Sequence, residues 1–336
     1  MAQTETPTAS ISSTPPPVPW SRRRLVAALV AAALVGAVLA TALLLGLRGR
    51  EAGGPGDDAG SAQAEQSGKL TWAPPELEDP VTVEVPTNGQ DLHLEPDQDY
   101  IVEMPDEPLD VTGGLVINGG RNVVLIGGEI RISEPGGRAQ EVRGLYLHDQ
   151  RGTVHVEGLH ITGSDLGEGI NLDQREGATV QLQNIRVDTV HGERDGQHAD
   201  VIQAWAGPSV LRLDRFTGYT TYQGFFLLPK QFLDEDPEGF DLRRVNLVAE
   251  SDDVGYLLWR DGDEWPIDVQ DVWVAPAEDD DRAQDEDADS LTWSKNDDSD
   301  SWGDVQVGVP PGGDFVPADS VGVDYVSPGY VEGDGE

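Results

Sequence analysis

The sequence predicts an all-β fold, a parallel β-helix solenoid, preceded by a single N-terminal transmembrane helix. Three observations predict it: a strand pattern that returns five times, a second strand family between its copies, and one long apolar run near the N-terminus. No convincing amphipathic helix follows that run. A chain of 336 residues is long enough to stack many such coils into one core.

The repeated strand pattern places apolar residues at relative positions 0, 2, 5 and 7. Its five copies begin at Val154, Val180, Leu211, Phe240 and Ile267, so successive starts are 26, 31, 29 and 27 residues apart. A nearly fixed period in this range is typical of a solenoid. An antiparallel β-sandwich also has many short strands, but its strands need not resemble each other.

A second family of short strands lies between copies of the first. Its members are Gly144–Leu147, Gly169–Leu172, Val201–Ala204, Gly224–Leu227 and Gly255–Leu258. Alternation points one pair from each strand inward, where it stacks on the pair of the next coil. These pairs are Leu145/Leu147, Ile170/Leu172, Ile202/Ala204, Phe225/Leu227 and Tyr256/Leu258.

The N-terminal apolar run, 25–47, contains no charged residue and is long enough to cross a bilayer as a helix. It is longer than the apolar core of a cleaved signal peptide, so we expect an uncleaved signal-anchor over 22–48. Three arginines precede the run and two follow it, which favours a cytoplasmic N-terminus. The expected location is the cell membrane, with a single pass and the large domain extracellular.

The rest of the chain divides by composition. Residues 1–21 are rich in Thr, Ser and Pro and predict a disordered cytoplasmic tail, and 49–78 predict a flexible linker. The β-helix domain is expected over 79–276. Residues 277–336 are expected to form an acidic loop and a C-terminal cap or tail, in which Phe315, Val316, Tyr325 and Tyr330 cover the open end of the solenoid.

Charge and cysteine content exclude several functions. The formal net charge is −40, which repels phosphate backbones, so no nucleic-acid partner is expected. The chain has no cysteine, which excludes disulfides, thiolate catalysis and cysteine zinc sites. His155 and His160 alternate with inward apolar residues and are expected to be polar surface groups.

The alternating coils, with Gly169-Ile170-Asn171 and Asp200-Val201-Ile202-Gln203 at matching corners, resemble the right-handed parallel β-helix, or pectin-lyase-like, superfamily. The resemblance covers about Val81 to Val274 and implies the fold. That superfamily includes polysaccharide lyases, glycoside hydrolases, esterases, adhesins and viral fibres, so the fold does not choose a function. The sequence signatures of pectate lyases and polygalacturonases are missing from this chain.

Outward positions of the second strand family form a candidate glycan-binding face. Aromatic rings stack on sugar rings, while amides and carboxylates bond to hydroxyl groups. An ordinary mixed surface is the alternative. The expected substrate-binding residues are Tyr146, His148, Asn171, Asp173, Gln203, Trp205, Phe226, Lys230, Trp259 and Arg260.

The densest polar cluster lies in the longest insertion, just before Gln203. Its carboxylates and imidazoles, which could perform acid–base chemistry, are His191, Glu193, Asp195, His198 and Asp200. Three carboxylates could instead bind a calcium ion, which prefers oxygen ligands: Asp173, Asp195 and Asp200. A solvated turn in which Asp200 caps a corner explains the same residues.

Three functions are compatible with this pattern. The first is a membrane-anchored protein that binds cell-surface or environmental polysaccharide. The second is a polysaccharide lyase or glycoside hydrolase that uses the His191–Asp200 cluster. The third is a structural spacer or protein-binding surface protein. No cofactor is certain, and calcium is the only one that the residues suggest.

Overall fold

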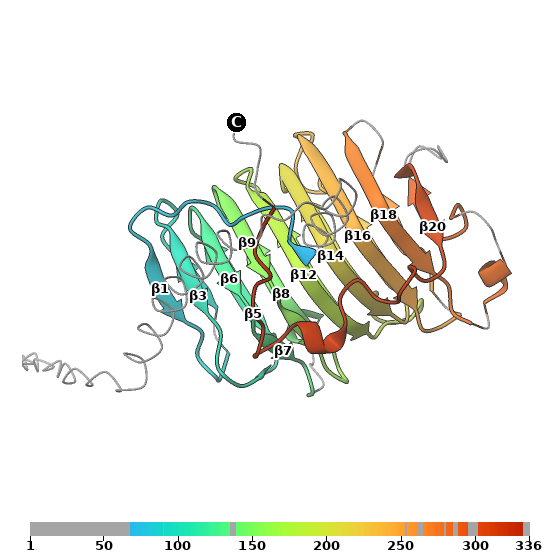
Figure 1. The fold of residues 1–336 in the computed structure, drawn as a ribbon, viewed down its shortest axis with the longest axis horizontal. Coiled ribbons are helices and arrows are strands. Elements are labelled where there is room, and N and C mark those ends of the chain that lie inside the picture. The colour runs from blue at the N-terminus through green and yellow to red at the C-terminus, as the bar shows by residue number, and fades with distance from the viewer. Residues whose placement is uncertain are drawn as a thin grey trace, which may run out of the picture. The chain divides into compact units, whose positions relative to one another are not determined.

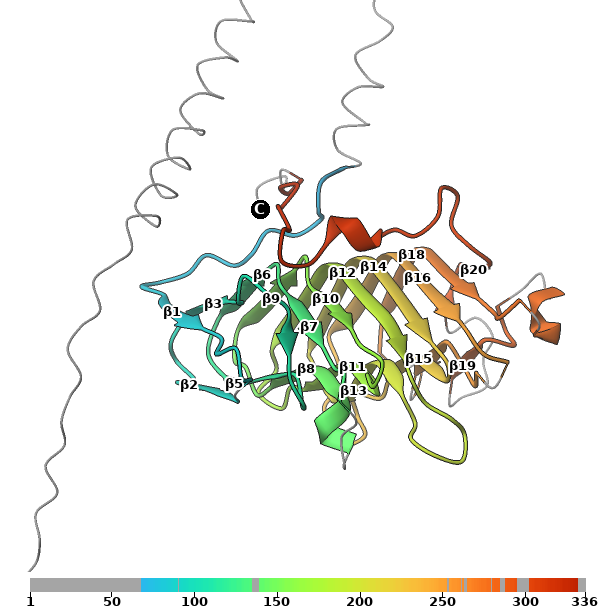
Figure 2. The same ribbon diagram turned by 90° about the horizontal axis from the view of Figure 1, so that it is seen from below.

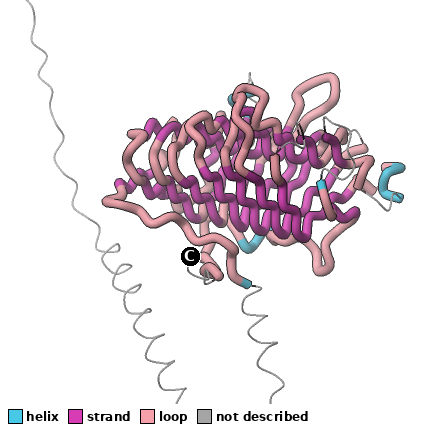
Figure 3. The backbone as a smooth tube through the Cα atoms, turned by 90° about the horizontal axis from the view of Figure 1, so that it is seen from above, coloured by secondary structure: helices cyan, strands magenta, loops and turns pink. Residues whose placement is uncertain are grey.

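A computed structural model describes residues 68–89, 91–134, 139–252, 254–260, 262, 265–278, 280–284, 288–294 and 302–331. These residues form a parallel β-solenoid whose strands stack coil upon coil (Figures 1 and 3). The expected signal-anchor and cytoplasmic tail lie outside the described residues. Among the residues described, no helix is long and apolar enough to cross a membrane.

The solenoid has two long sheets. The smaller sheet has eight strands, in the order β19-β17-β15-β13-β11-β8-β5-β2. Their bounds are β2 Leu92–Leu94, β5 Leu115–Gly119, β8 Arg143–His148, β11 Glu168–Asp173, β13 Asp200–Ala206, β15 Gln223–Leu227, β17 Leu258–Arg260 and β19 Thr292–Ser294.

The larger sheet has twelve strands, with β1-β3-β6-β9-β12-β14-β16-β18-β20 as its main path and β4, β7 and β10 beside it. Their bounds are β1 Val81–Glu84, β3 Tyr100–Glu103, β4 Leu109–Asp110, β6 Val123–Ile126, β7 Glu129–Arg131, β9 Thr153–Glu157, β10 His160–Thr162, β12 Thr179–Val190, β14 Val210–Thr220, β16 Gly239–Ala249, β18 Ile267–Ala275 and β20 Val305–Val307. The described residues also include the short 3-10 helices η1 Ala139–Val142, η2 Asp281–Gln284 and η4 Ala318–Ser320.

The five copies of the repeated pattern stack in register, as predicted. Val154 pairs with Val180, Val180 with Leu211, Leu211 with Phe240, and Phe240 with Ile267. Apart from Ile267 and Val269, which are partly buried, the apolar positions of the pattern lie in the buried core. The repeat therefore is the core of the solenoid, because each coil buries its apolar row against the next.

A left-handed residue explains the gap of three in the 0, 2, 5, 7 spacing. The residue at relative position 4 has a positive φ in every copy: Gly158 (70°), Asn184 (52°), Arg215 (55°), Arg244 (49°) and Asp271 (55°). One residue in this conformation bends the strand. The next inward side chain therefore comes three residues after the previous one, and not two. Glycine adopts this φ freely, whereas other residues lose about 1–2 kcal/mol.

The second strand family is confirmed in four of its five members. The inward pairs from Leu145/Leu147 to Phe225/Leu227 are buried in the core. The fifth member was predicted two residues too early, because Phe225 pairs with Leu258 and not with Tyr256. Trp259 therefore continues the outward row, and Arg260 takes the inward place that pairs with Leu227.

The outer face of the larger sheet is covered by the two ends of the described chain, which run over it along different paths in Figures 1 and 2. The backbone of Trp72 donates to Gln183 of β12 over 2.9 Å, and Leu70 forms a parallel bridge with Tyr330. The segment 314–330 runs back over the strands, where the backbone N–H of Val316 donates to Thr217 over 3.0 Å. Phe315, Val316, Tyr325 and Tyr330 thus lie on this face and not over the open end of the solenoid.

This covering corrects the expectation for His155. Its side chain points away from the core, but it is completely buried and its Nε2 lies 3.0 Å from Glu157. Tyr325 and Tyr330 donate their hydroxyl groups to the same carboxylate over 2.7 and 2.6 Å. Burial acts to raise the pKa of Glu157, but the hydrogen bonds from His155, Tyr325, Tyr330 and Ser327 outweigh it and lower that pKa. His160 is half-buried and pairs with Asp188 over 2.7 Å.

Candidate functional site

The outward side chains of the smaller sheet form continuous rows, because its strands pair in register. Neighbouring strands lie about 4.8 Å apart, which brings equivalent side chains into contact. The longest row begins at Val116, and its six further members are Tyr146, Asn171, Gln203, Phe226, Trp259 and Trp293. We call this row the outer strip, together with the side chains beside it: Arg143, His148, Glu168, Asp173, Asp200 and Trp205.

Two groups of aromatic rings lie on the outer strip. In the first, the centroids of Tyr146 and Trp205 are 5.6 Å apart, and the Arg143 guanidinium lies 5.3 Å from each ring. In the second, Trp259 lies 5.0 Å from Phe226 and 4.5 Å from Trp293. All these rings are partly exposed, so each keeps an edge or face toward solvent.

Amides separate the two aromatic groups. Asn171 is buried, and its Nδ2 donates to Glu168 over 2.7 Å and to Gln203 over 3.2 Å. Gln203 is partly exposed. The outer strip thus presents aromatic, amide and again aromatic groups along consecutive coils.

Asp173 holds the first aromatic group in place. Arg175 donates to its carboxylate over 2.8 Å, and Tyr146 donates over 3.4 Å. Burial acts to raise the pKa of Asp173, but hydrogen bonds from Arg175 and Trp205 outweigh it, so the pKa lies below its usual value. Asp173 is therefore an ionised anchor for the rings beside it.

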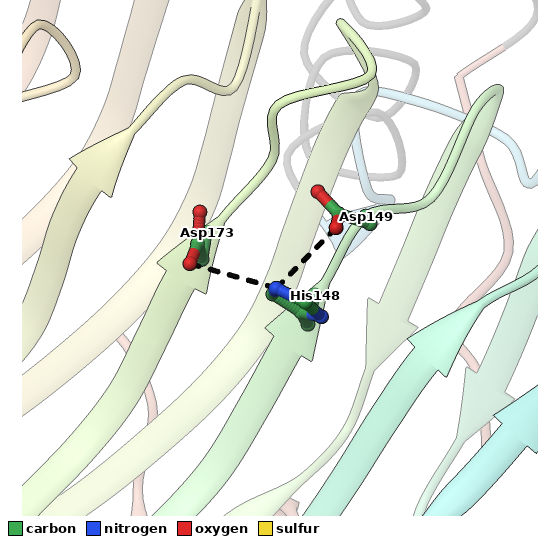
Figure 4. Close-up of side chains that lie close together, drawn as sticks. All are labelled: His148, Asp149 and Asp173. Atoms are coloured by element: carbon green, nitrogen blue, oxygen red, sulfur yellow. Dashed lines mark ion pairs between the residues drawn. The ribbon is translucent and has the colours of Figure 1, made fainter. Parts of the chain in front are cut away.

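One group of side chains could hold a metal ion among the residues that the structure describes. The ligand atoms of His148, Asp149 and Asp173 lie within 4.8 Å of one another. Figure 4 shows the imidazole of His148 between the two carboxylates, 3.3 Å from Asp149 and 3.5 Å from Asp173. Arg175 already neutralises Asp173, so a divalent cation there would compete with the guanidinium.

Two buried carboxyl groups lie side by side at the start of the neighbouring strands β11 and β13. Glu168 and Asp200 occupy equivalent places, two residues before the paired Ile170 and Ile202. Glu168 is 5% exposed and Asp200 is 1% exposed. Burial raises the pKa of Glu168 to about 7, although the Asn171 hydrogen bond and the charge of Arg143 act to lower it. Burial holds the pKa of Asp200 well above its usual value, and the negative charge of Glu168 raises that pKa by a smaller amount.

The structure separates Asp200 from the rest of the cluster that the sequence singled out. His191, Glu193, Asp195 and His198 are exposed on the loop before β13. The ring of His198 packs on Tyr222 with centroids 5.0 Å apart, and its Nε2 lies 3.2 Å from the carbonyl oxygen of Arg194. Asp200 is buried, and the charge that acts on it is that of Glu168. The five residues therefore do not form one acid–base group.

The expected calcium ligands are not brought together either. Asp200 begins β13, Asp173 ends the neighbouring strand β11, and Asp195 is exposed on the loop.

Two of the expected substrate-binding residues do not belong to the outward rows of the smaller sheet. Arg260 is buried, and its guanidinium donates to the carbonyl oxygen of Trp265 over 2.7 Å. Lys230 lies in the loop after β15 and pairs with Asp236.

Sequence reasoning missed Glu168 and Arg143. A signal for Glu168 was available, since Glu168-Gly-Ile-Asn aligns with Asp200-Val-Ile-Gln and places an acid at the same corner of consecutive coils. Arg143 occupies the equivalent position on the preceding coil, where it pairs with Glu168. Aligning each strand one residue further toward its N-terminus places Glu168 and Arg143 in the same row as Asp200.

Comparison with protein families, with curated proteins and with solved structures finds no match to this chain. The geometry of the outer strip therefore carries the functional conclusion.

Proposed function

We propose that this protein binds an extended polysaccharide along the outer strip. The observation that supports this most is the unbroken outward row across six coils, in which partly exposed aromatic rings flank the Gln203 amide. Rings stack on the CH faces of sugars, and amides and carboxylates bond to hydroxyl groups. A chain of sugars laid across the strands would meet both kinds of group in turn.

The order of groups along the strip also suits a neutral or weakly charged glycan. Arg143 lies over Tyr146 and Trp205, and Asp173 with Arg175 forms a neutral pair. The protein as a whole carries a formal charge of −40, which repels a strongly acidic polysaccharide unless cations screen it.

Retention on immobilised or gel-embedded polysaccharides tests the proposal. Trp205→Ala should weaken retention on the preferred glycan by about 1–3 kcal/mol, roughly 5- to 150-fold in the dissociation constant, because one large contact surface is lost. Trp273→Ala is a matched control, since Trp273 is a partly exposed tryptophan of the larger sheet.

Two results would contradict the proposal. If the wild-type chain is retained by no polysaccharide of a broad panel, the spacer or protein-binding alternative takes its place. If Trp205→Ala and Trp273→Ala weaken retention equally, binding does not occur at the outer strip.

We also propose that the solenoid is displayed outside the cell on the N-terminal signal-anchor, and that it has the right-handed form. The uncharged run 25–47 and the arginines before it support the anchor and its orientation. Parallel strand crossovers are right-handed in about 98% of known cases, which supports the hand. Protease added to intact cells should digest the β-helix domain; protection until the cells are lysed would overturn this topology.

A further inference from the structure

A pocket lies on the outer face of the larger sheet, away from the smaller sheet that carries the outer strip. Its volume is about 320 Å³, which is within the range of pockets that hold small molecules. Strands β12 and β14 contribute its floor, and the segment 314–330 contributes its walls. The lining residues that matter for a ligand are Asn184, Arg215, Phe315, Asp319, Asp324 and Tyr325.

Hydrogen bonds to the sheet hold the walls of this pocket in place. The backbone N–H of Val316 donates to Thr217 over 3.0 Å, and the Tyr325 hydroxyl donates to Glu157 over 2.7 Å. Tyr325 also lies directly over Gly158, where a Cβ atom would come within 2.0 Å of its ring. The pocket lies between these attachment points, so its shape is fixed by the fold.

A cationic side chain lies at the floor of the pocket. Arg215 occupies the left-handed position of its coil, with a φ of 55°, as Asn184 does on the preceding coil. Burial, and next the positive charge of Arg244, lower the pKa of Arg215, and the opposing charges of Asp214 and Tyr325 do not offset them. The charged guanidinium therefore costs free energy in this place. A carboxylate bound in the pocket would reduce that cost, because a guanidinium and a carboxylate form charge-assisted hydrogen bonds.

The solvent side of the same pocket is acidic and apolar. Asp319 and Asp324 line it and are exposed. Val326 also lines it, with 83% of its surface exposed. The two carboxylates, and the formal net charge of −40, repel a ligand that carries only negative charge. The lining therefore suits a ligand with one carboxylate, one cationic group and an apolar body.

We propose that this pocket binds a free amino acid with an apolar side chain. The ligand carboxylate pairs with Arg215, and its ammonium group pairs with Asp319 or Asp324. Its side chain packs against the rings of Phe315 and Tyr325. A residue at the end of a peptide has only one of the two charges, so the pocket distinguishes a free amino acid from a peptide terminus. This site is separate from the outer strip and goes beyond polysaccharide binding.

Isothermal titration calorimetry of the full chain with four compounds tests the proposal. Phenylalanine has both charges and an apolar ring. N-Acetylphenylalanine keeps only the carboxylate, phenylalaninamide keeps only the ammonium group, and glycine keeps both charges without a side chain. Each of these three should bind about tenfold or more weakly than phenylalanine, because each lacks one of the three contacts.

Arg215→Gly removes the guanidinium without straining the strand, because glycine adopts a positive φ freely. This variant should bind phenylalanine about tenfold or more weakly, while its binding of phenylalaninamide should not weaken. The matched control is Asp271→Gly, the same backbone change at the equivalent position of β18, where φ is also 55°. It should bind phenylalanine as the wild type does.

The double variant Asp319→Asn and Asp324→Asn tests the other charge. It should weaken the binding of phenylalanine and of phenylalaninamide, and it should leave the binding of N-acetylphenylalanine no weaker than in the wild type.

Three results would overturn the proposal. The first is that none of the four compounds binds at concentrations up to its solubility. The second is that Arg215→Gly binds phenylalanine as tightly as Asp271→Gly does, which would place the ligand elsewhere. The third is that N-acetylphenylalanine or phenylalaninamide binds as tightly as phenylalanine, which would show recognition of a peptide terminus and not of a free amino acid.

Discussion

Replacement of Glu168 by glutamine should remove a pH-dependent cost of about 3 kcal/mol from the folded state. Burial raises the pKa of Glu168 from its ordinary value of 4.5 to about 7 in the folded protein. At about 1.4 kcal/mol for each factor of ten in proton affinity, this difference gives about 3 kcal/mol. The folded state therefore holds the proton more tightly than the unfolded chain does.

The sign follows from linkage. The stability that the protonated group contributes is fully present below about pH 4.5 and is lost as the pH rises to about 7. In Glu168→Gln that side chain no longer titrates. The variant should therefore gain stability relative to the wild type by about 3 kcal/mol between these two pH values.

Unfolding in urea, followed by tryptophan fluorescence at a series of pH values, measures this difference. The charge of Glu168 raises the pKa of Asp200, so the measured difference reports the removal of Glu168 together with its effect on Asp200. Glu176→Gln, at an exposed carboxylate, should show no comparable trend. A difference between Glu168→Gln and wild type that stays constant within about 1 kcal/mol across the range would refute the reasoning, because Glu168 would then titrate as an exposed glutamate does.

Two further predictions concern the core and the covered face. Ile202→Asp should destabilise the fold by several kcal/mol through a buried unpaired charge, whereas Gln203→Ala should cost less than about 1 kcal/mol, as thermal melts would show. Equal melting temperatures for the two variants would mean that the inward and outward positions are reversed. Glu157→Gln should weaken the hydrogen bonds from Tyr325 and Tyr330 and make the segment 314–330 more sensitive to protease at neutral pH. Because the folded-state pKa of Glu157 is lowered, this contribution is full above about pH 4.5 and is lost below it, so the two proteins should become equally sensitive in acid.

The repeat pattern alone predicts how the coils stack and which residues form the core. Apolar residues at positions 0, 2, 5 and 7 can be buried together only if each coil lies on the next, so the pattern predicted the stacking of Val154, Val180, Leu211, Phe240 and Ile267 that the structure shows. The same periodicity placed Tyr146, Gln203 and Trp205 on the outward side of the smaller sheet. Such inferences are reliable because they depend on local alternation and on the repeat length.

The electrostatics of the site depend on contacts between coils that no single strand reveals. The alignment with Asp200 places Glu168 at a corner of the coil, but it does not show that the carboxyl group is buried, and burial is what raises its pKa. The exposed loop residues Glu193 and Asp195 have the same chemical groups and stay in solvent. Likewise, His155 is buried beside Glu157 because the segment around Tyr330, 173 residues after Glu157 in the sequence, folds back over both side chains. Burial and the charges that face a group depend on contacts between distant parts of the chain, so a pattern within one strand cannot fix them.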